Sequence, residues 1–387
     1  MAYSKPLAIV VASVGKLPYA GISLYYLHQI IGLQDLGYEV HYAERVNRPD
    51  ECYNPVSGIS SDDPSFALDY LERVLGEYGI APARFSFIDR ENRCHGSGWE
   101  GLRTALRSAD FVLTVADPTW FEELELCPRR MFIDADPLFT QVAMETKSGT
   151  RAIAPQHYQT LFSYCTRFGK TDCTVPPGGR TWFASRPSVA TRIWTPAPPD
   201  SRLPLTGLMH WAAGSEVIWD GVAYGHKDRE FQNFLDLPSY GGGPFVLAVG
   251  GRRAPRDLLS QRGWQLADPL EQTGTIENYR RFIAGSRADL GIAKHAYVAS
   301  RCGWFSDRAT CFLASGRPVL HQDTGFRDWL PEGPGVLSFA NLEELREAIH
   351  RLDLDYAQHA RAARAVAQEY FEATRIAGEM LDVAGLR

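Results

Sequence analysis

The feature that most constrains the fold is an apolar, β-branched run near the start of the chain, followed by a helical pattern and a second strand. Residues 7–13 read LAIVVAS, which is typical of a strand buried on both faces of a parallel sheet. Apolar residues then recur three and four positions apart over residues 22–36, and Gly37 stands where a helix would stop. The segment 38–44, YEVHYAE, is the next predicted strand. This β-α-β opening predicts an α/β fold with a parallel sheet.

The same alternation returns in the second half of the chain. Predicted strands are 205–211, 244–251, 264–268, 288–294, 318–323 and 335–339, and predicted helices are 226–237, 255–263, 276–286 and 341–352. Residues 355–385 form a long Ala-rich stretch with high helix propensity. The pattern indicates a second parallel sheet.

Length and composition favour two domains. A chain of 387 residues exceeds what one hydrophobic core usually supports, and 45% apolar residues suffice to build two cores. Residues 171–205 are rich in Pro and Gly, and their end, TPAPPDSRLP at 195–204, reads as the linker.

Charge and cysteine usage argue against several classes of function. Forty basic and 46 acidic residues give a net charge of −6, and both signs are scattered along the chain, so we expect no nucleic-acid partner. The seven cysteines form no CxxC pair and no zinc-like spacing, which predicts reduced thiols and no metal site. No targeting or membrane-spanning segment is visible, so a cytoplasmic protein is expected.

A glycine turn followed by a capped helix stands out at residues 300–316. Gly303 makes the turn, Ser306 can cap, Asp307 lies in the first turn and Gly316 ends the helix. The N–H groups of such a helix end favour an anion, and Arg301 adds a cation. An ordinary turn before a helix that Ser306 caps is an equally good interpretation.

A second loop suited to anions follows the predicted strand 244–251. Gly250 and Gly251 precede Arg252, Arg253 and Arg256, whose guanidinium groups could hold a diphosphate. Taken alone, this loop is more simply explained as a solvated surface turn.

Other candidates stand at predicted strand ends, which border the ligand crevice of an open α/β sheet. Asp117 and Asp136 each follow a short apolar run, and Lys294 closes the strand 288–294. The loop 13–21 places Gly15 and Gly21 at the first crossover, without the GxGxxG spacing of a dinucleotide site.

On these residues the sequence resembles nucleotide-sugar-dependent glycosyltransferases of the GT-B architecture. The segment RCGWFSD at 301–307 is similar to the HCGWNS segment of the plant secondary-product enzymes, and CFLASGRPVLHQDTG at 311–325 to the helix and tail that close their donor pocket. Residues 21–44 are similar to their first helix and second strand.

The resemblance implies two Rossmann-like parallel-sheet domains that face each other across a cleft. Residues 1–198 would form the acceptor-side domain, with a C-terminal helix at about 367–387 packing back on it. Residues 199–366 would form the domain that binds the nucleotide sugar. A monomer or homodimer is expected.

The implied activity is hexosyl transfer from a UDP- or dTDP-sugar to a hydroxyl of a small, natural-product-like molecule or a glycan, without metal or other cofactor. The residues implied for donor and diphosphate binding are Arg252, Arg253, Lys294, Arg301, Gly303, Trp304, Ser306, Asp307, Asp323 and Thr324. Gly15, Tyr19 and Gly21 would line the cleft, and the base would be Asp136 or, second, Asp117.

The chain departs from the family pattern at several positions. Arg301 replaces the motif histidine, and the ribose-binding glutamate falls on Ala309 or Cys311, depending on the end from which the motif is counted. Asp307 or Glu271 could substitute for it. A sugar-nucleotide epimerase of the same fold and a non-catalytic protein that binds nucleotide sugars or glycans are the alternatives.

Overall fold

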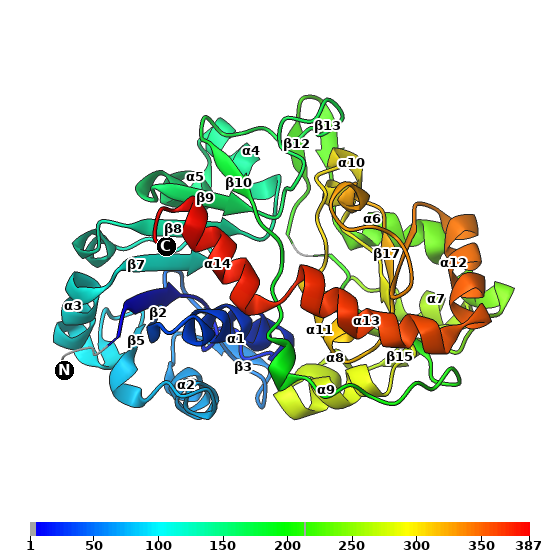
Figure 1. The fold of residues 1–387 in the computed structure, drawn as a ribbon, viewed down its shortest axis with the longest axis horizontal. Helices are drawn as coiled ribbons and strands as arrows, with labels where there is room; N and C mark the ends of the chain where they lie inside the picture. The colour runs from blue at the N-terminus through cyan, green and yellow to red at the C-terminus, as the bar shows by residue number, and fades with distance from the viewer. Residues whose placement is uncertain (1–4, 213) are drawn as a thin grey trace.

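Two separate sheets, each flanked by helices, organise the chain in the computed structural model, which describes residues 5–212 and 214–387 (Figure 1). The first sheet has the strand order β10-β9-β8-β7-β1-β2-β5-β6, and its pairs are parallel except for β5 with β6. Its strands are β1 (Leu7–Val11), β2 (Glu39–Arg45), β5 (Phe85–Ile88), β6 (Cys94–Gly96), β7 (Phe111–Val115), β8 (Arg130–Asp134), β9 (Thr160–Ser163) and β10 (Trp182–Ala184). Its helices are α1 (Ala20–Asp35), α2 (Ser65–Glu77), α3 (Gly98–Ser108), α4 (Phe139–Thr146) and α5 (Gly149–Ile153).

The second sheet has the order β15-β14-β11-β16-β17-β18 and is parallel throughout. Its strands are β11 (Leu205–His210), β14 (Phe245–Gly250), β15 (Gln265–Ala267), β16 (Ala288–Gly291), β17 (Val319–Gln322) and β18 (Val336–Phe339). The helices of this half are α6 (Lys227–Phe231), α7 (Arg256–Gln261), α8 (Pro269–Thr273), α9 (Ile276–Ala284), α10 (His295–Ser300), α11 (Asp307–Ala314) and α12 (Leu342–Leu354). The predicted α/β class with two parallel sheets is confirmed. The boundary at residue 198 stays a prediction.

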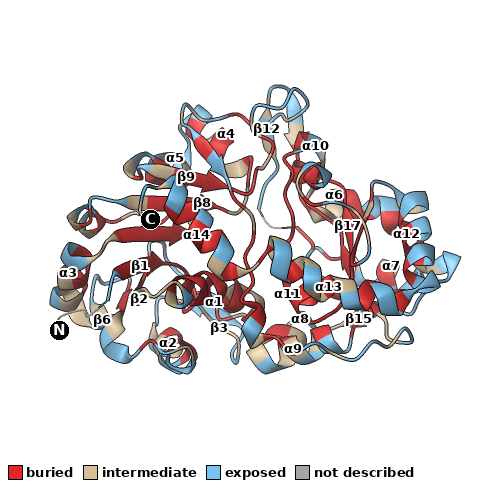
Figure 2. Cartoon of the chain, viewed as in Figure 1, coloured by how far each residue is buried: buried red, intermediate tan, exposed pale blue. Residues whose placement is uncertain are grey.

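The first strand shows why the apolar run was informative. Every residue of β1 is buried, and β1 lies between β2 and β7 in the middle of the sheet (Figure 2). Parallel strands covered on both faces need apolar side chains at each position, so the run is continuous and does not alternate.

The C-terminal stretch, predicted as one helix over 355–385, is divided into α13 (Tyr356–Tyr370) and α14 (Ala373–Val383). The break occurs because the backbone there pairs with another segment: Val189 N donates to Phe371 O (2.7 Å) and Ala373 N to Val189 O (3.0 Å). Figure 1 shows the consequence, since α13 packs beside α11 in the second half and α14 beside α1 in the first.

Two short hairpins are absent from the sequence-based prediction. They are formed by β3 (Cys52–Asn54) with β4 (Ile59–Ser61) and by β12 (Val217–Trp219) with β13 (Val222–Tyr224). Strands of three residues are too short to show an alternating pattern. Over the part of the chain that the structure describes, no helix combines the length and apolarity that crossing a bilayer requires.

Candidate functional site

A cleft of about 760 Å³ lies where the carboxyl ends of strands from both sheets meet. The first half contributes Tyr19, Gly21, Ile22, Tyr53, Ala135 and Asp136, and residues of the second half complete the wall. In an open α/β sheet the strand ends are the usual place for a ligand. Position and size therefore make this cleft the candidate site.

Asp136, just beyond β8, joins the two halves across the cleft. Its carboxylate accepts a hydrogen bond from Lys294 Nζ at 2.6 Å and another from the Tyr297 hydroxyl, while Arg151 lies 3.6 Å away. Burial favours the neutral acid, but the Lys294 and Arg151 charges and these hydrogen bonds outweigh it and hold the pKa of Asp136 below its usual value. Asp136 is thus a carboxylate at neutral pH.

Asp117, beyond β7, has a different surrounding. Its carboxylate lies 3.3 Å from Lys16 Nζ and 3.3 Å from Ser13 Oγ, and it is not among the residues that line the cleft. Of the two carboxylates expected at strand ends, the structure brings only Asp136 into the cleft.

The second half supplies the cations of the cleft: Lys227, Arg256, Lys294 and Arg308. Arg308 is fixed by Asp289 through two hydrogen bonds of 2.9 and 3.1 Å. Arg256 donates to the carbonyl oxygens of Val249 (3.0 Å) and Gly251 (3.2 Å). Within residues 5–212 and 214–387, no carboxylate lies within ion-pair distance of Arg256.

Lys227, the first residue of α6, is a cation without a carboxylate partner among the described residues. Burial, with a smaller contribution from the charge of Arg308, lowers the pKa of Lys227 to about 7. Lys227 and Arg308 are absent from the sequence-based site. In the sequence, Lys227 belongs to a stretch that is typical of a polar helix face. The signal that could have identified Lys227 as a site residue is its place in the first crossover after β11.

The glycine turn leads into α11 as expected, and Trp304, Ser306 and Asp307 line the cleft. Ser306 is the N-cap residue, but its side chain makes no capping hydrogen bond, and its backbone N–H donates to His321 Nε2 at 3.2 Å. Burial raises the pKa of Asp307, against the charge of Arg308. The carboxyl group of Asp307 therefore lies at the helix end where the sequence suggested an anion-binding site.

Several residues that the sequence predicted for the site do not line the cleft and lie in neighbouring loops and turns. Arg301 is in ion-pair contact with Asp172 at 2.8 Å. Gly303 has a φ of +80°, and a Cβ there would clash with Thr166 Oγ1. The others in this position are Gly15, Arg252, Arg253, Asp323 and Thr324. Their expected contacts with a donor stay predictions.

Of that group, Gly15, Arg253, Asp323 and Thr324 have hydrogen-bond partners within the protein. Gly15 N donates to the carboxylate of Glu44 at 2.8 Å, and Arg253 donates to the carbonyl oxygen of Gly214 at 3.2 Å. Asp323 accepts from Gly325 N at 2.8 Å, and Thr324 Oγ1 donates to the carbonyl oxygen of Trp304.

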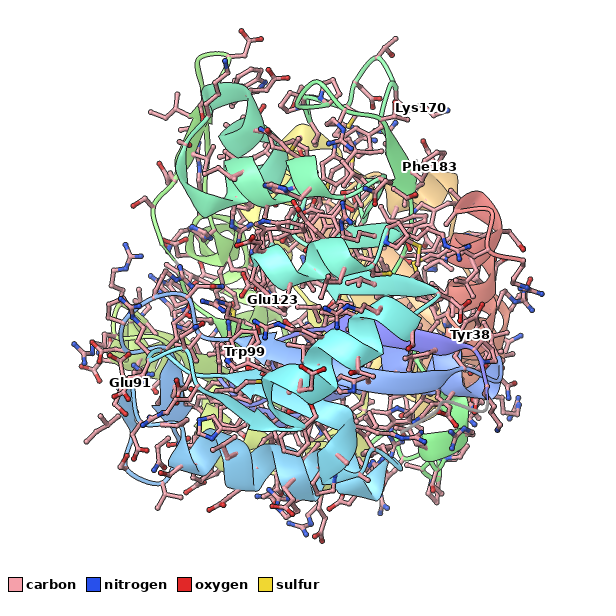
Figure 3. The ribbon with its side chains drawn as sticks, turned by 90° about the vertical axis from the view of Figure 1, so that its left-hand side faces the viewer. Tyr38, Glu91, Trp99, Glu123, Lys170 and Phe183 are labelled. Atoms are coloured by element: carbon pink, nitrogen blue, oxygen red, sulfur yellow. The ribbon has the colours of Figure 1, made fainter. Side chains whose placement is uncertain are left out.

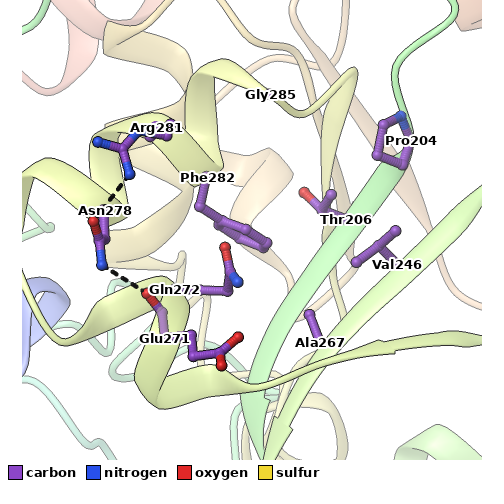
Figure 4. A pocket seen from close by; sticks show the side chains of 10 residues that line it. All are labelled: Pro204, Thr206, Val246, Ala267, Glu271, Gln272, Asn278, Arg281, Phe282 and Gly285. Atoms are coloured by element: carbon purple, nitrogen blue, oxygen red, sulfur yellow. Dashed lines mark hydrogen bonds between the residues drawn. The ribbon is translucent and has the colours of Figure 1, made fainter.

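Glu271 lines a different hollow, of about 410 Å³, beside β11, β14 and β15 (Figure 4). There Asn278 Nδ2 donates to the carbonyl oxygen of Glu271 at 2.9 Å, and Arg281 donates to Asn278 Oδ1 at 3.1 Å. Of the two carboxylates suggested to replace the ribose ligand, only Asp307 lines the cleft between the sheets. Among the described side chains, no group of three or more His, Cys, Asp or Glu is arranged to hold a metal ion.

Solved structures with the same fold cover nearly the whole chain. An α-glucosyltransferase in complex with UDP-glucose and DNA containing an abasic site superposes with a TM-score of 0.60 at 11% identity, covering 98% of this chain and 99% of that chain. Sucrose-phosphate synthase from Thermosynechococcus elongatus gives 0.54 at 14% identity, covering 98% of each chain. Anabaena HepE in complex with UDP gives 0.54 at 11% identity, covering 98% of this chain and 99% of that chain. No family model matches the sequence, and no curated protein matches it.

These neighbours are GT-B glycosyltransferases, so the chain has the GT-B fold that the sequence resemblance implied. The expectation of no nucleic-acid partner is wrong as an inference from bulk charge, because a structure of this fold holds DNA beside UDP-glucose. A net charge of −6 averages over the whole surface, whereas binding depends on the local field around a cleft.

Proposed function

We propose that the protein transfers a sugar from a nucleoside-diphosphate sugar, UDP- or dTDP-linked, to a hydroxyl group of an acceptor. The observation that carries this proposal is the pair of cations, Lys227 and Arg256, that enter the cleft without a carboxylate partner among the described residues. Cations in such a position are suited to a ligand that brings two adjacent negative charges, as a diphosphate does.

The diphosphate would lie against Lys227 and Arg256. A guanidinium group can hold two phosphate oxygens at once. A phosphate beside Lys227 would raise the pKa of this amine, which burial lowers to about 7, and so favour its charged form. In the reaction, the bond between the anomeric carbon and the phosphate oxygen breaks and the diphosphate leaves with the electron pair. Cations fixed before the reaction stabilise this charge, so the proposal needs no metal ion or other cofactor.

The nucleoside would lie beside the carboxyl ends of β14 and β15. Gly250, Gly251, His210 and Asp268 line this part of the cleft. One carboxylate oxygen of Asp268, Oδ1, accepts hydrogen bonds from Leu270 N (2.7 Å) and Glu271 N (3.2 Å). The second oxygen of Asp268 and the carboxyl group of Asp307 are both suited to accept hydrogen bonds from donor hydroxyl groups.

The acceptor would enter from the first half, past Tyr19 and Tyr53, whose rings stack with centroids 5.2 Å apart. Asp136 is ionised and lines the cleft, so it is suited to take the proton of the acceptor hydroxyl as the new bond to the anomeric carbon forms. Lys294 would hold the Asp136 carboxylate in position until an acceptor hydroxyl group takes the place of the Lys294 amine.

The test is turnover with a panel of UDP- and dTDP-sugars against small-molecule, oligosaccharide and hydroxyl-bearing DNA acceptors, read by mass spectrometry. A product heavier than an acceptor by one sugar residue supports the proposal. An isomerised donor without any acceptor product would indicate an epimerase, and binding without turnover a binding protein, and either result would contradict it.

Arg256→Ala provides the residue-level control of that experiment. We expect it to weaken donor binding about 10- to 100-fold, since hydrogen bonds to charged groups contribute about 1.5–3 kcal/mol. Arg262→Ala is the matched variant: Arg262 follows α7, pairs with Asp236 and lies outside the cleft. Equal donor affinity in the two variants would remove Arg256 from the site.

A further inference from the structure

Two cysteines in the loop after β9 lie face to face. The Sγ atoms of Cys165 and Cys173 are 3.7 Å apart, and a disulfide bond is about 2.0 Å long, so a shift of about 1.7 Å would join them. Cys165 is buried, whereas Cys173 is partly exposed. We propose that this pair is a redox-active dithiol, which a peroxide converts into a disulfide within the loop.

The two thiols differ in exposure and in pKa, as this reaction requires. A hydrogen bond with the Cys165 thiol lowers the pKa of Cys173 and so favours its thiolate form. Burial, with the neighbouring thiols of Cys173 and Cys302, raises the pKa of Cys165. Cys173 is therefore the nucleophile that meets the oxidant, and Cys165 is the resolving thiol, which needs no access to solvent.

The reaction balances with a peroxide as the only oxidant. The Cys173 thiolate attacks one peroxide oxygen, the O–O bond breaks, and a sulfenic acid and a hydroxide ion form; the hydroxide takes up the proton that the Cys173 thiol released on ionisation and becomes the first water. Cys165 then attacks the Cys173 sulfur, gives up its proton, and the hydroxyl group leaves as a second water. Two thiols lose two electrons in total, and the peroxide gains them.

The loop that carries the pair also connects the two halves of the molecule. Thr166 Oγ1 donates to Gly303 O at 3.2 Å, Arg167 to Arg301 O at 2.9 Å, and Thr174 N to Ser300 O at 3.0 Å. These three contacts reach the turn that leads into α11. The loop reaches the surface, where Lys170 is exposed (Figure 3), and Cys173 itself is partly exposed.

The test is peptide mapping of the full chain after treatment with hydrogen peroxide, with free thiols alkylated and the digest left unreduced. We expect a linked pair of peptides containing Cys165 and Cys173, which dithiothreitol separates. Cys94 is the internal control: it is also partly exposed, but burial raises its pKa to about 11, so it should remain open to alkylation. Free, alkylated Cys165 after Cys173 has been oxidised would overturn the proposal.

Three variants distinguish the roles of the thiols. In Cys165→Ser, peroxide should take Cys173 on to the sulfinic acid, because the resolving thiol is gone. In Cys173→Ser, Cys165 should stay reduced. Cys302→Ser should still form the disulfide between Cys165 and Cys173. Absence of this disulfide in the Cys302→Ser variant would contradict the assignment, and so would a disulfide between Cys173 and Cys302 in the unmodified chain.

Discussion

At the scale of single residues, Lys227 determines how the cleft responds to pH. Its pKa is about 7 in the free protein, and a bound diphosphate would raise it. Below pH 7 the amine is charged with or without ligand, so affinity should be constant. Above pH 7 binding must take up a proton, so the affinity for UDP-glucose should fall, approaching tenfold per pH unit. Calorimetry from pH 6 to pH 9 measures this directly.

The matching substitution is Lys227→Met, which keeps the length of the side chain and removes the charge. We expect about a 10- to 100-fold loss of affinity at pH 6.5 and a flat profile above it. Lys5→Met, at an exposed position outside the cleft, is the control. A variant profile that still falls above pH 7 would assign the pH dependence to another group.

Asp136 is the residue on which catalysis rests in this account. Asp136→Asn keeps the shape of the side chain but cannot accept the acceptor proton, so kcat should fall at least about 100-fold. The affinity for UDP-glucose should stay within about threefold, because the cations that hold the diphosphate are unchanged. Steady-state kinetics and calorimetry separate the two effects. Transfer at the original rate would eliminate Asp136 as the base.

At the scale of elements, the contact between α1 and α14 depends on a glycine. A Cβ at Gly32 would lie 2.6 Å from the carbonyl oxygen of Ala373, which is backbone and cannot give way cheaply. Gly32→Ala should therefore destabilise the fold by about 1–3 kcal/mol, as overpacked positions do. Urea unfolding followed by circular dichroism gives the value.

Gly76 in α2 is the matched control for that substitution. A Cβ there meets nothing within 4 Å, so Gly76→Ala should be neutral or stabilise by up to about 1 kcal/mol through helix propensity. Equal effects at the two positions would mean that α14 does not pack on α1 as described.

The sequence predicted elements better than it predicted contacts. The run at β1, the helix pattern at α1 and the strand ends before Asp117 and Asp136 follow from local rules and hold in the structure. The break between α13 and α14 does not follow from them, because Val189, far away in the chain, supplies the pairing. Where an element ends because it pairs with a remote segment, local sequence patterns do not predict that end.

The same distinction explains the site at the scale of the whole molecule. Arg301 looks suited to a phosphate in the sequence, but Asp172, which is remote in sequence, is its partner in the structure. Lys227 looks like a solvated helix residue, yet the fold encloses it in the cleft. Whether a charged side chain can bind a ligand depends on whether the fold places an oppositely charged partner beside it. These partners are remote in the chain, so local sequence patterns do not identify them.

The central claim is that a nucleotide sugar binds between the two sheets, with its diphosphate on Lys227 and Arg256. The most direct measurement is a crystal structure with UDP-glucose bound. The account predicts phosphate oxygens within hydrogen-bond distance of both cations and the sugar between Asp307 and Asp136. A diphosphate bound elsewhere, for example in the hollow beside Phe282, would contradict it.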